Sequence, residues 1–431
     1  MKFFSLNNNS PVVSFKEAVI NGLAPDKGLY FPNHIKPLPK SFFQNMATMG
    51  NHEIAMTAIK QFVSRDLSAQ VINRIIFDVI DFSFPLVEIE KNVASLELFH
   101  GPTMAFKDVG ARFMALCLGN LMEGENTKIT VLVATSGDTG GAVAQGFLGV
   151  NGVDVVILYP SGGVSPIQEK QLTTLGQNIT ALEVHGTFDD CQSMVKTAFS
   201  DNDITPKIKL TSANSINVSR WLPQLFYFLF AYKQVQSKAK KIVFSVPSGN
   251  FGNVCAGMVA QKLGMPIKQF VASTNINDTV PNFMKTGKYC PKPAKATISN
   301  AMDVSNPSNF KRIRHLYNNN LEDLRKNLYS YSFTDDETSQ AIHDVYLNSS
   351  YILDPHGAIG YLGLKKYQKT NPDTYGIFLE TAHPVKFKDT VEKAINKDLV
   401  IPDKVKLILL KEKKSFKISN YEELKAFLLE N

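Results

Sequence analysis

The chain has 431 residues, of which 44% are hydrophobic and 20% are charged, a composition typical of a folded globular protein with two or three domains. The formal net charge of +7 comes largely from scattered lysines that match no nucleic-acid motif, so we expect no nucleic-acid partner. No apolar run reaches the roughly 20 residues that cross a bilayer, and no signal-peptide pattern opens the chain, so we expect no membrane partner and a cytoplasmic location.

Residues 1–90 are predicted to form a separate N-terminal unit. A turn-rich connector at 21–32 carries glycine and proline at its corners, and helical patterns follow to about residue 79. Nothing in this unit offers obvious chemistry.

The stretch from Leu98 to Gly110 contains a single lysine, Lys107, among small and apolar residues, ahead of a helical pattern over 111–121. We expect Lys107 to be half-buried. Burial lowers the pKa of a lysine, and a neutral amine can attack an aldehyde to form a Schiff base. Because a lysine at the start of a helix is more often a solvated surface group, this interpretation needs support from the rest of the chain.

From residue 128 onward, short β-branched runs alternate with helical segments, which predicts an α/β fold of parallel sheets covered by helices on both faces. The expected strands lie at 129–134, 153–159, 179–184, 209–212, 241–246, 267–273, 375–379 and 405–410, and a final helix starts at 421. The four cysteines, widely spaced along this pattern, lie near no histidine at metal-ligand spacing, so we expect reduced thiols and no metal.

In parallel sheets, ligands bind beyond the carboxyl ends of the strands, and two loops there are distinctive. The first, Thr135–Gly141, combines glycines with Ser136 and Thr139, whose hydroxyls and helix-opening amides can bind an anion. The same residues also suit an ordinary helix cap. The local sequence leaves both interpretations open.

The second loop, Ser245–Asn253, is rich in Gly, Asn and Ser and opens an apolar helix, which makes it suited to cradling a phosphate. It lacks the lysine of a Walker loop and the spacing of a dinucleotide fingerprint. The phosphate is therefore expected to belong to a smaller cofactor. Lys107 and this loop together match the aldehyde and the phosphate of pyridoxal 5'-phosphate, and Thr381 could offer a neutral hydroxyl to its pyridine nitrogen.

Five segments of the chain together carry a family resemblance: HGPTMAFKD at 100–108, TSGDTGGA at 135–142, NSINVSR at 214–220, PSGNFGN at 247–253 and ETAHPVKF at 380–387. They resemble the threonine synthase family, in the subgroup with an additional N-terminal domain, and GLAPDKGLYFP at 22–32 resembles that N-terminal domain. The resemblance implies a pyridoxal-phosphate enzyme of fold type II, the tryptophan synthase β-like fold, with two parallel-sheet subdomains and a small N-terminal domain. It further implies a lyase that converts O-phospho-L-homoserine and water to L-threonine and phosphate.

The resemblance also implies a role for individual residues. Lys107 is expected to form the Schiff base and to act as the catalytic base, and Thr381 is expected to face the pyridine nitrogen. The cofactor phosphate is assigned to Gly249, Asn250, Phe251 and Asn253, and the substrate carboxylate to Ser136, Gly137, Asp138 and Thr139. For the substrate phosphate we expect Arg220, with Asn217 beside it, then Arg112 and thirdly Lys386, because arginine can bind phosphate through two parallel hydrogen bonds. The base that acts at Cβ stays open between Lys107 and the departing phosphate.

The expected division of the chain is an N-terminal domain at 1–90, a larger cofactor-binding subdomain at 91–125 and 213–400, a smaller mobile subdomain at 126–212, and an extension at 401–431 packed on the body. The expected assembly is a monomer or a homodimer. Two alternatives remain: a threonine or serine dehydratase or cysteine synthase on the same fold, and a non-catalytic paralogue that binds the cofactor or a phosphorylated ligand.

Overall fold

The computed structural model describes residues 1–125, 127–238 and 241–430, and its N-terminal unit is mainly helical. The short antiparallel pair of this unit joins Phe3–Ser5 to Tyr30–Pro32. Its elements are β1 (Phe3–Ser5), α1 (Phe15–Asn21), β2 (Tyr30–Pro32), α2 (Lys40–Asn45), the 3-10 turn η1 (Met46–Thr48), α3 (Asn51–Val63) and α4 (Ala69–Val79). This unit ends before the predicted residue 90, because the chain at Leu86–Glu90 already forms a strand of the next sheet.

The larger sheet has six strands in the order β11-β10-β9-β12-β4-β3, all parallel except β3 at one edge. The strands are β3 (Leu86–Glu90), β4 (Val93–Glu97), β9 (Lys241–Pro247), β10 (Gln269–Thr274), β11 (Leu328–Ser332) and β12 (Thr374–Glu380). The surrounding helices and 3-10 turns are α9 (Val218–Trp221), η2 (Leu222–Gln224), α10 (Leu225–Val235), α11 (Gly252–Lys262), α12 (Thr279–Thr286), η3 (Asn300–Met302), α13 (Phe310–Leu316), α14 (Leu321–Arg325), α15 (Asp335–Ser349), α16 (Pro355–Gln368), η4 (Pro384–Phe387) and α17 (Lys388–Ile395).

Alternation along the strands places apolar side chains on both faces of this sheet. Val243 and Val271 belong to the apolar cluster formed with α15, α16 and α17. Their neighbours Phe244 and Phe270 face the opposite side, where Phe228 of α10 packs against both rings at 5.1 and 5.8 Å. The sheet is therefore buried between two layers of helices, as predicted.

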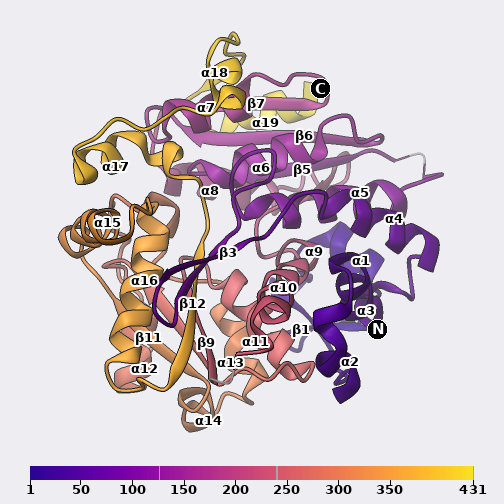
Figure 1. The fold of residues 1–431 in the computed structure, drawn as a ribbon. Coiled ribbons are helices and arrows are strands. Elements are labelled where there is room, and N and C mark those ends of the chain that lie inside the picture. Colours follow the sequence, from indigo (N-terminus) through magenta and orange to yellow (C-terminus); the bar gives the residue numbers. More distant parts are fainter. Residues whose placement is uncertain (126, 239–240, 431) are drawn as a thin grey trace.

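The smaller sheet has five parallel strands in the order β13-β7-β6-β5-β8. The strands are β5 (Ile129–Ala134), β6 (Val153–Pro160), β7 (Ile179–Val184), β8 (Lys209–Thr211) and β13 (Phe416–Ile418), and the helices are α6 (Asp138–Phe147), α7 (Pro166–Thr173), α8 (Phe188–Ala198), α18 (Asp403–Leu409) and α19 (Tyr421–Glu430). Figure 1 shows this sheet at the top of the view and the larger sheet below it.

Helix α5 (Lys107–Leu121) joins the two sheets, because it follows β4 of the larger sheet and precedes β5 of the smaller one. It packs against α6, α9 and α4. The C-terminal segment packs on the smaller sheet: β13 extends it beside β7, and α18 and α19 contact α7 and α8. Residues 126 and 431, which bound two of the predicted units, lie outside the described residues.

The strand predicted at 405–410 is wrong, because this segment is helix α18. Val405 is buried against Ile167, and Leu409, four residues later, packs partly on the same cluster. Leu407 is 64% exposed. The apolar contacts thus follow the helical spacing of four residues, and the strand of this segment comes later, in β13.

All four cysteines are unpaired thiols, and three of them, Cys117, Cys191 and Cys255, are buried. Within the described ranges there is no group of three or more acidic, histidine or cysteine side chains that could hold a metal ion. A search of the same residues finds no helix with the length and apolar character that crossing a membrane requires.

Candidate active site

The loop that carries Lys107 is tied to the segment that follows β12. The N–H of Phe106 donates to the carbonyl of Thr381 at 2.8 Å, and the N–H of His383 donates to the carbonyl of Met104 at 3.1 Å. These bonds flank an antiparallel bridge between Ala105 and Ala382. The backbone contacts therefore bring Lys107 and Thr381 together, although 274 positions separate them in the sequence.

Lys107 lies at the first turn of α5 and is half-buried, as predicted. Burial lowers the pKa of its amine to about 8, and the nearby cations Lys386 and Arg220 lower it further, while Asp138 acts in the opposite direction. Roughly a tenth of this amine is therefore neutral at pH 7, far more than for an ordinary lysine, and able to act as a nucleophile or a base.

The loop after β5 is folded around the hydroxyl of Thr135, which accepts hydrogen bonds from the N–H groups of Gly137 at 3.0 Å and Gly140 at 2.8 Å. Gly137 has a φ of +135°, and a Cβ there would lie 2.5 Å from Gln168, so only glycine fits. No hydrogen bond from the described residues occupies the hydroxyls of Ser136 and Thr139. Two side chains of the predicted anion loop are thus available, while two of its amides are used within the loop.

The carboxylate of Asp138 is bound inside the protein through its Oδ1 atom. Its Oδ1 lies 2.6 Å from Nζ of Lys386 and accepts a hydrogen bond from Nε2 of Gln168 at 3.0 Å. Burial raises the pKa of Asp138, but Lys386, Lys107 and His356 outweigh this effect and hold the pKa below its usual value. The side chain of Asp138 is consequently an ionised partner of Lys386 rather than a donor for a substrate carboxylate.

The glycine-rich loop after β9 ends at the N-terminus of α11, where helix-opening amides can face an anion. Phe251 adopts the left-handed conformation, with a φ of +61°. At Gly249 a Cβ would lie 2.9 Å from Cα of Met302, so the loop requires glycine to pack against this backbone. The amide of Asn250 is used within the protein, because it donates to Ser215 at 2.8 Å and accepts from the N–H of Ser308 at 2.6 Å.

Asn253 provides a direct test of whether this loop suits a phosphate. The residue is buried, and neither the nitrogen nor the oxygen of its side-chain amide has a hydrogen-bond partner among the described residues. Buried amides are normally paired. An exogenous group with acceptor oxygens, such as the phosphate of pyridoxal 5'-phosphate, would satisfy the donor, so the residues present fit that group.

Arg220 is also buried without partners. Its Nε and Nη1 atoms form no hydrogen bond with the described residues, and burial lowers the pKa of the guanidinium to about 10. The carbonyl of Arg220 lies against Gly110 of α5, where a Cβ would approach it to 2.3 Å. The charge of Arg220 is close enough to affect Lys107. This arrangement is suited to an anion delivered by a ligand.

The chain matches three family models that together extend over almost its whole length. The model described as threonine synthase N terminus matches residues 2–79, pyridoxal-phosphate dependent enzyme matches 86–378, and threonine synthase, C-terminal, matches 357–428. The threonine synthase of Buchnera aphidicola subsp. Baizongia pistaciae is 43% identical over 100% of both chains, and that of Escherichia coli is 41% identical over 93% of both.

The chain belongs to the threonine synthase family. The crystal structure of the Escherichia coli threonine synthase superposes with a TM-score of 0.93 at 39% identity and covers 100% of both chains. The pyridoxal-phosphate-bound threonine synthase of Brucella melitensis also has a TM-score of 0.93, at 31% identity over 99% of this chain and 98% of that one. The predicted fold type II and pyridoxal 5'-phosphate as the cofactor are thereby confirmed.

Besides the side chain of Asp138, two further residues predicted to bind substrate have structural partners instead. Arg112 forms two hydrogen bonds to Asp81, at 2.5 and 2.9 Å, in a partly exposed ion pair. Asn217 caps α9 through Ser219, and its Nδ2 donates to the carbonyl of Val19 at 2.8 Å. The structure therefore gives no support to either as a substrate ligand. Of the two predicted arginines, Arg220 is the one with guanidinium nitrogens that have no partner among the described residues.

Lys386, the third candidate for the substrate phosphate, is likewise paired within the protein, because its Nζ lies 2.6 Å from Oδ1 of Asp138 and donates to the carbonyl of Thr103 at 3.0 Å. The sequence assigned no role to His356. Lys386 appears in ETAHPVKF, a segment that carries the resemblance to the threonine synthases, but the sequence does not show that its amine pairs with Asp138. The only signal for His356 is its position in an Asp-Pro-His-Gly segment at 354–357, which is typical of a helix start.

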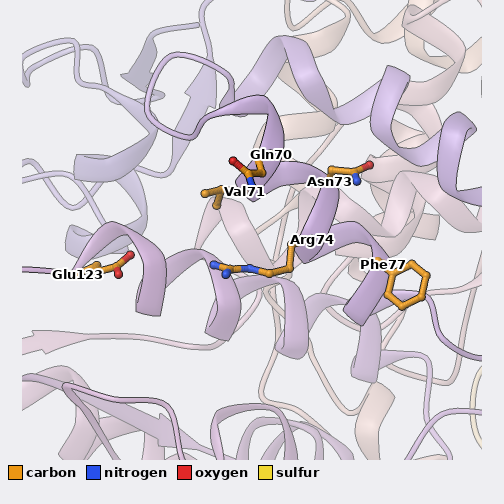
Figure 2. Close-up of a pocket in the computed structure, with 6 residues that line it drawn as sticks. All are labelled: Gln70, Val71, Asn73, Arg74, Phe77 and Glu123. Atoms are coloured by element: carbon orange, nitrogen blue, oxygen red, sulfur yellow. The ribbon is translucent and has the colours of Figure 1, made fainter.

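A surface hollow of about 510 Å³ lies apart from these residues, between α4 and the end of α5 (Figure 2). It is lined by Gln70, Val71, Asn73, Arg74, Phe77 and Glu123. None of the residues that we predicted to bind cofactor or substrate is among them. Arg74 is already bound to Asn120 at 2.6 Å. We assign no catalytic or binding role to this hollow.

Proposed function

We propose that this chain converts O-phospho-L-homoserine and water to L-threonine and phosphate, with Lys107 as the catalytic base and Arg220 as a ligand of the substrate phosphate. The observation that carries the proposal is the buried guanidinium of Arg220, which has two unpartnered nitrogens near the Lys107 amine. A buried cation whose nitrogens lack hydrogen-bond partners is unfavourable in a free protein, and an anionic substrate would compensate it. The threonine synthase relatives support the same reaction.

Pyridoxal 5'-phosphate, when bound, supplies an aldehyde that reacts with an amine and a ring that withdraws electrons from the carbons of an amino acid. We assign its Schiff base to Lys107 and its phosphate to Gly249, Asn250, Phe251 and Asn253. Asn250 contributes through its backbone, since its side chain is held by Ser215 and Ser308. Thr381 is assigned to the pyridine nitrogen because its carbonyl fixes the residue that precedes Lys107.

Lys107 removes the proton from Cα of the substrate, a task suited to an amine whose pKa is lowered to about 8. In the net reaction the bond between Cγ and the phosphate oxygen breaks, a proton is lost from Cβ and one is added at Cγ, the hydroxyl from water is added at Cβ, and the proton at Cα is restored. The base that acts at Cβ stays open between Lys107 and the departing phosphate.

The substrate carboxylate is assigned to the loop after β5, through the free hydroxyls of Ser136 and Thr139 and the backbone at Gly137 and Asp138. Lys386 neutralises the side chain of Asp138 at 2.6 Å, so this carboxylate repels the substrate less than an unpaired one. The pair also connects α6 of the smaller sheet to η4 of the larger one. We propose that residues 126–212 form a subdomain that closes over the substrate and excludes water.

The proposed setting of this biosynthetic reaction is the cytoplasm, and the proposed assembly is a monomer or a homodimer. The test of the function is an assay of the purified, cofactor-loaded protein with O-phospho-L-homoserine, in which phosphate and amino-acid product are measured in the same sample. Equal amounts of phosphate and threonine are expected. Deamination of serine or threonine without phosphate release would favour the dehydratase alternative, and neither activity would favour a non-catalytic paralogue.

A further inference from the structure

His356 stands in the first turn of α16 and is oriented by Asp354, the cap of that helix. Oδ1 of Asp354 accepts a hydrogen bond from the backbone N–H of His356 at 2.6 Å and lies 3.2 Å from Nδ1 of its ring. The other carboxylate oxygen, Oδ2, accepts from the N–H of Ala382 at 3.2 Å. The imidazole is therefore linked through one carboxylate to the residue next to Thr381.

Glu380 binds the backbone of Asp354. Its Oε1 accepts a hydrogen bond from the N–H of Asp354 at 2.5 Å, and both residues are completely buried. Burial and the adjacent Asp354 raise the pKa of Glu380 well above its usual value, which favours the protonated form of Glu380. Gly357 permits this approach, because a Cβ there would lie 1.6 Å from Oε2 of Glu380.

The ring of His356 lies between the two halves of the candidate site. It packs against the ring of Phe387, next to Lys386, in a T-shaped arrangement with ring centroids 4.8 Å apart. One turn further along α16, Ile359 packs with Met302, whose backbone contacts Gly249 of the cofactor loop. Asp138 and Asp303 both lie within electrostatic range of the imidazole. His356 thus lies near the Thr381 segment and the Asp138–Lys386 pair, and the next turn of α16 reaches toward the cofactor loop through Met302.

The outer nitrogen of this ring, Nε2, is buried and has no hydrogen-bond partner among the described residues, and His356 as a whole is only 3% exposed. A role in capping α16 accounts for the carboxylate of Asp354 but leaves the imidazole nitrogen unexplained. Because burying an unpaired polar atom costs folding free energy, such an atom at a site is a candidate for binding a ligand.

We propose that His356 is a further substrate-binding residue, whose Nε2–H donates a hydrogen bond to an anionic oxygen of the substrate and product, with Asp354 and Glu380 as positioning residues. The inference rests on the proposed function, which supplies the ligand. Two anionic groups share this chemistry, the phosphate and the amino-acid carboxylate. Oδ1 of Asp354, 3.2 Å from Nδ1, fixes the orientation of the ring.

The test uses cofactor-loaded protein labelled with nitrogen-15 in its histidines and records the ring nitrogen signals by NMR during titration with inorganic phosphate or, separately, with L-threonine. The His356 signal is identified by its loss in His356→Gln. A saturable change of that signal is expected in one titration, in the phosphate arm if the phosphate is bound and in the threonine arm if the carboxylate is bound. A signal that stays constant in both would overturn the inference, whatever the stability of the variants.

Affinity measurements provide a second readout. His356→Gln and Asp354→Asn should each weaken binding of the responsive product about tenfold, the effect of losing one charge-assisted hydrogen bond, and Asn still caps α16. His343→Gln is the matched control, because its ring lies on α15 and Nδ1 is 3.0 Å from the carbonyl of Ala394. Unchanged affinity in a folded His356→Gln protein would contradict the proposal. Absence of phosphate release by the unmodified protein would instead refute the proposed function.

Discussion

The two buried arginines Arg220 and Arg312 form a matched pair that differs in hydrogen bonding. Arg220 leaves two nitrogens unpartnered, whereas every nitrogen of Arg312 is used. Nε and Nη2 of Arg312 donate to the carbonyl of Tyr30 at 3.2 and 3.0 Å, and Nη1 donates to the carbonyl of Ser215 at 3.1 Å. The two residues are equally inaccessible to solvent but differ in their partners, so their replacement should have opposite effects on stability.

The expected magnitude for Arg220 comes from its burial. A pKa lowered from 12.5 to about 10 corresponds to about 3 kcal/mol of unfavourable free energy for the charged form. Arg220→Met removes the charge and keeps most of the side-chain length, so the free energy of unfolding should rise by about 1–3 kcal/mol. Arg312→Met leaves several buried carbonyls without donors and should lower that free energy by about 3–5 kcal/mol.

Urea unfolding of the two cofactor-loaded variants and of the unmodified protein measures this difference. Although Arg220→Met should be more stable than the unmodified protein, it should be less active. Its kcat/KM for O-phospho-L-homoserine should fall about 100-fold or more, because two charge-assisted hydrogen bonds to the phosphate are lost. The assignment of Arg220 as an unpaired phosphate ligand would be refuted by either of two results. One is that the Arg220→Met protein is destabilised as much as the Arg312→Met protein, and the other is that it keeps the kcat/KM of the unmodified protein.

Three further predictions follow from the cofactor site. Lys107→Ala should abolish turnover while the protein still binds pyridoxal 5'-phosphate reversibly, which dialysis and absorbance can establish; retained turnover would contradict the role of Lys107. In the protein freed of cofactor, the rate of cofactor capture should rise as the pH increases through about 8, since only the neutral amine of Lys107 reacts. Lys386→Met removes a cation that lowers this pKa, so the midpoint should move to higher pH, and a shift to lower pH would count against the geometry. Gly249→Ala should weaken cofactor affinity about tenfold or more, because its Cβ would lie 2.9 Å from the Met302 backbone, whereas Gly50→Ala, with open space around it, should leave the affinity unchanged.

Most of the fold could be predicted because the local sequence determines it. The β-branched runs at 129–134 and 179–184 appear as β5 and β7 with the same bounds. The structure of short segments with mixed signals is harder to predict. The run at 405–410 contains strand-forming residues, but only Val405 and Leu409 pack against the apolar cluster beside α18, and their spacing of four residues is helical. The early start of the larger sheet, at Leu86, depends on pairing with β4, which local propensity does not encode.

The candidate site was predictable where its residues form continuous motifs and not where distant side chains meet. Lys107 and the loop after β9 could be recognised from their own neighbourhoods. The pairing of Asp138 with Lys386 joins positions 248 residues apart, and that of Arg112 with Asp81 is equally invisible in the sequence. Asn217 resembled a ligand because capping and ligand binding favour the same polar residue types.

The measurement that tests the central claim most directly is the position of the cofactor on the chain. Reduction of the loaded protein with borohydride fixes the cofactor to the lysine that holds it, and mass spectrometry of the peptides locates that lysine. The cofactor is expected on the peptide that contains Lys107. Attachment at Lys386, the other lysine in this buried cluster, or at no single lysine, would contradict the account.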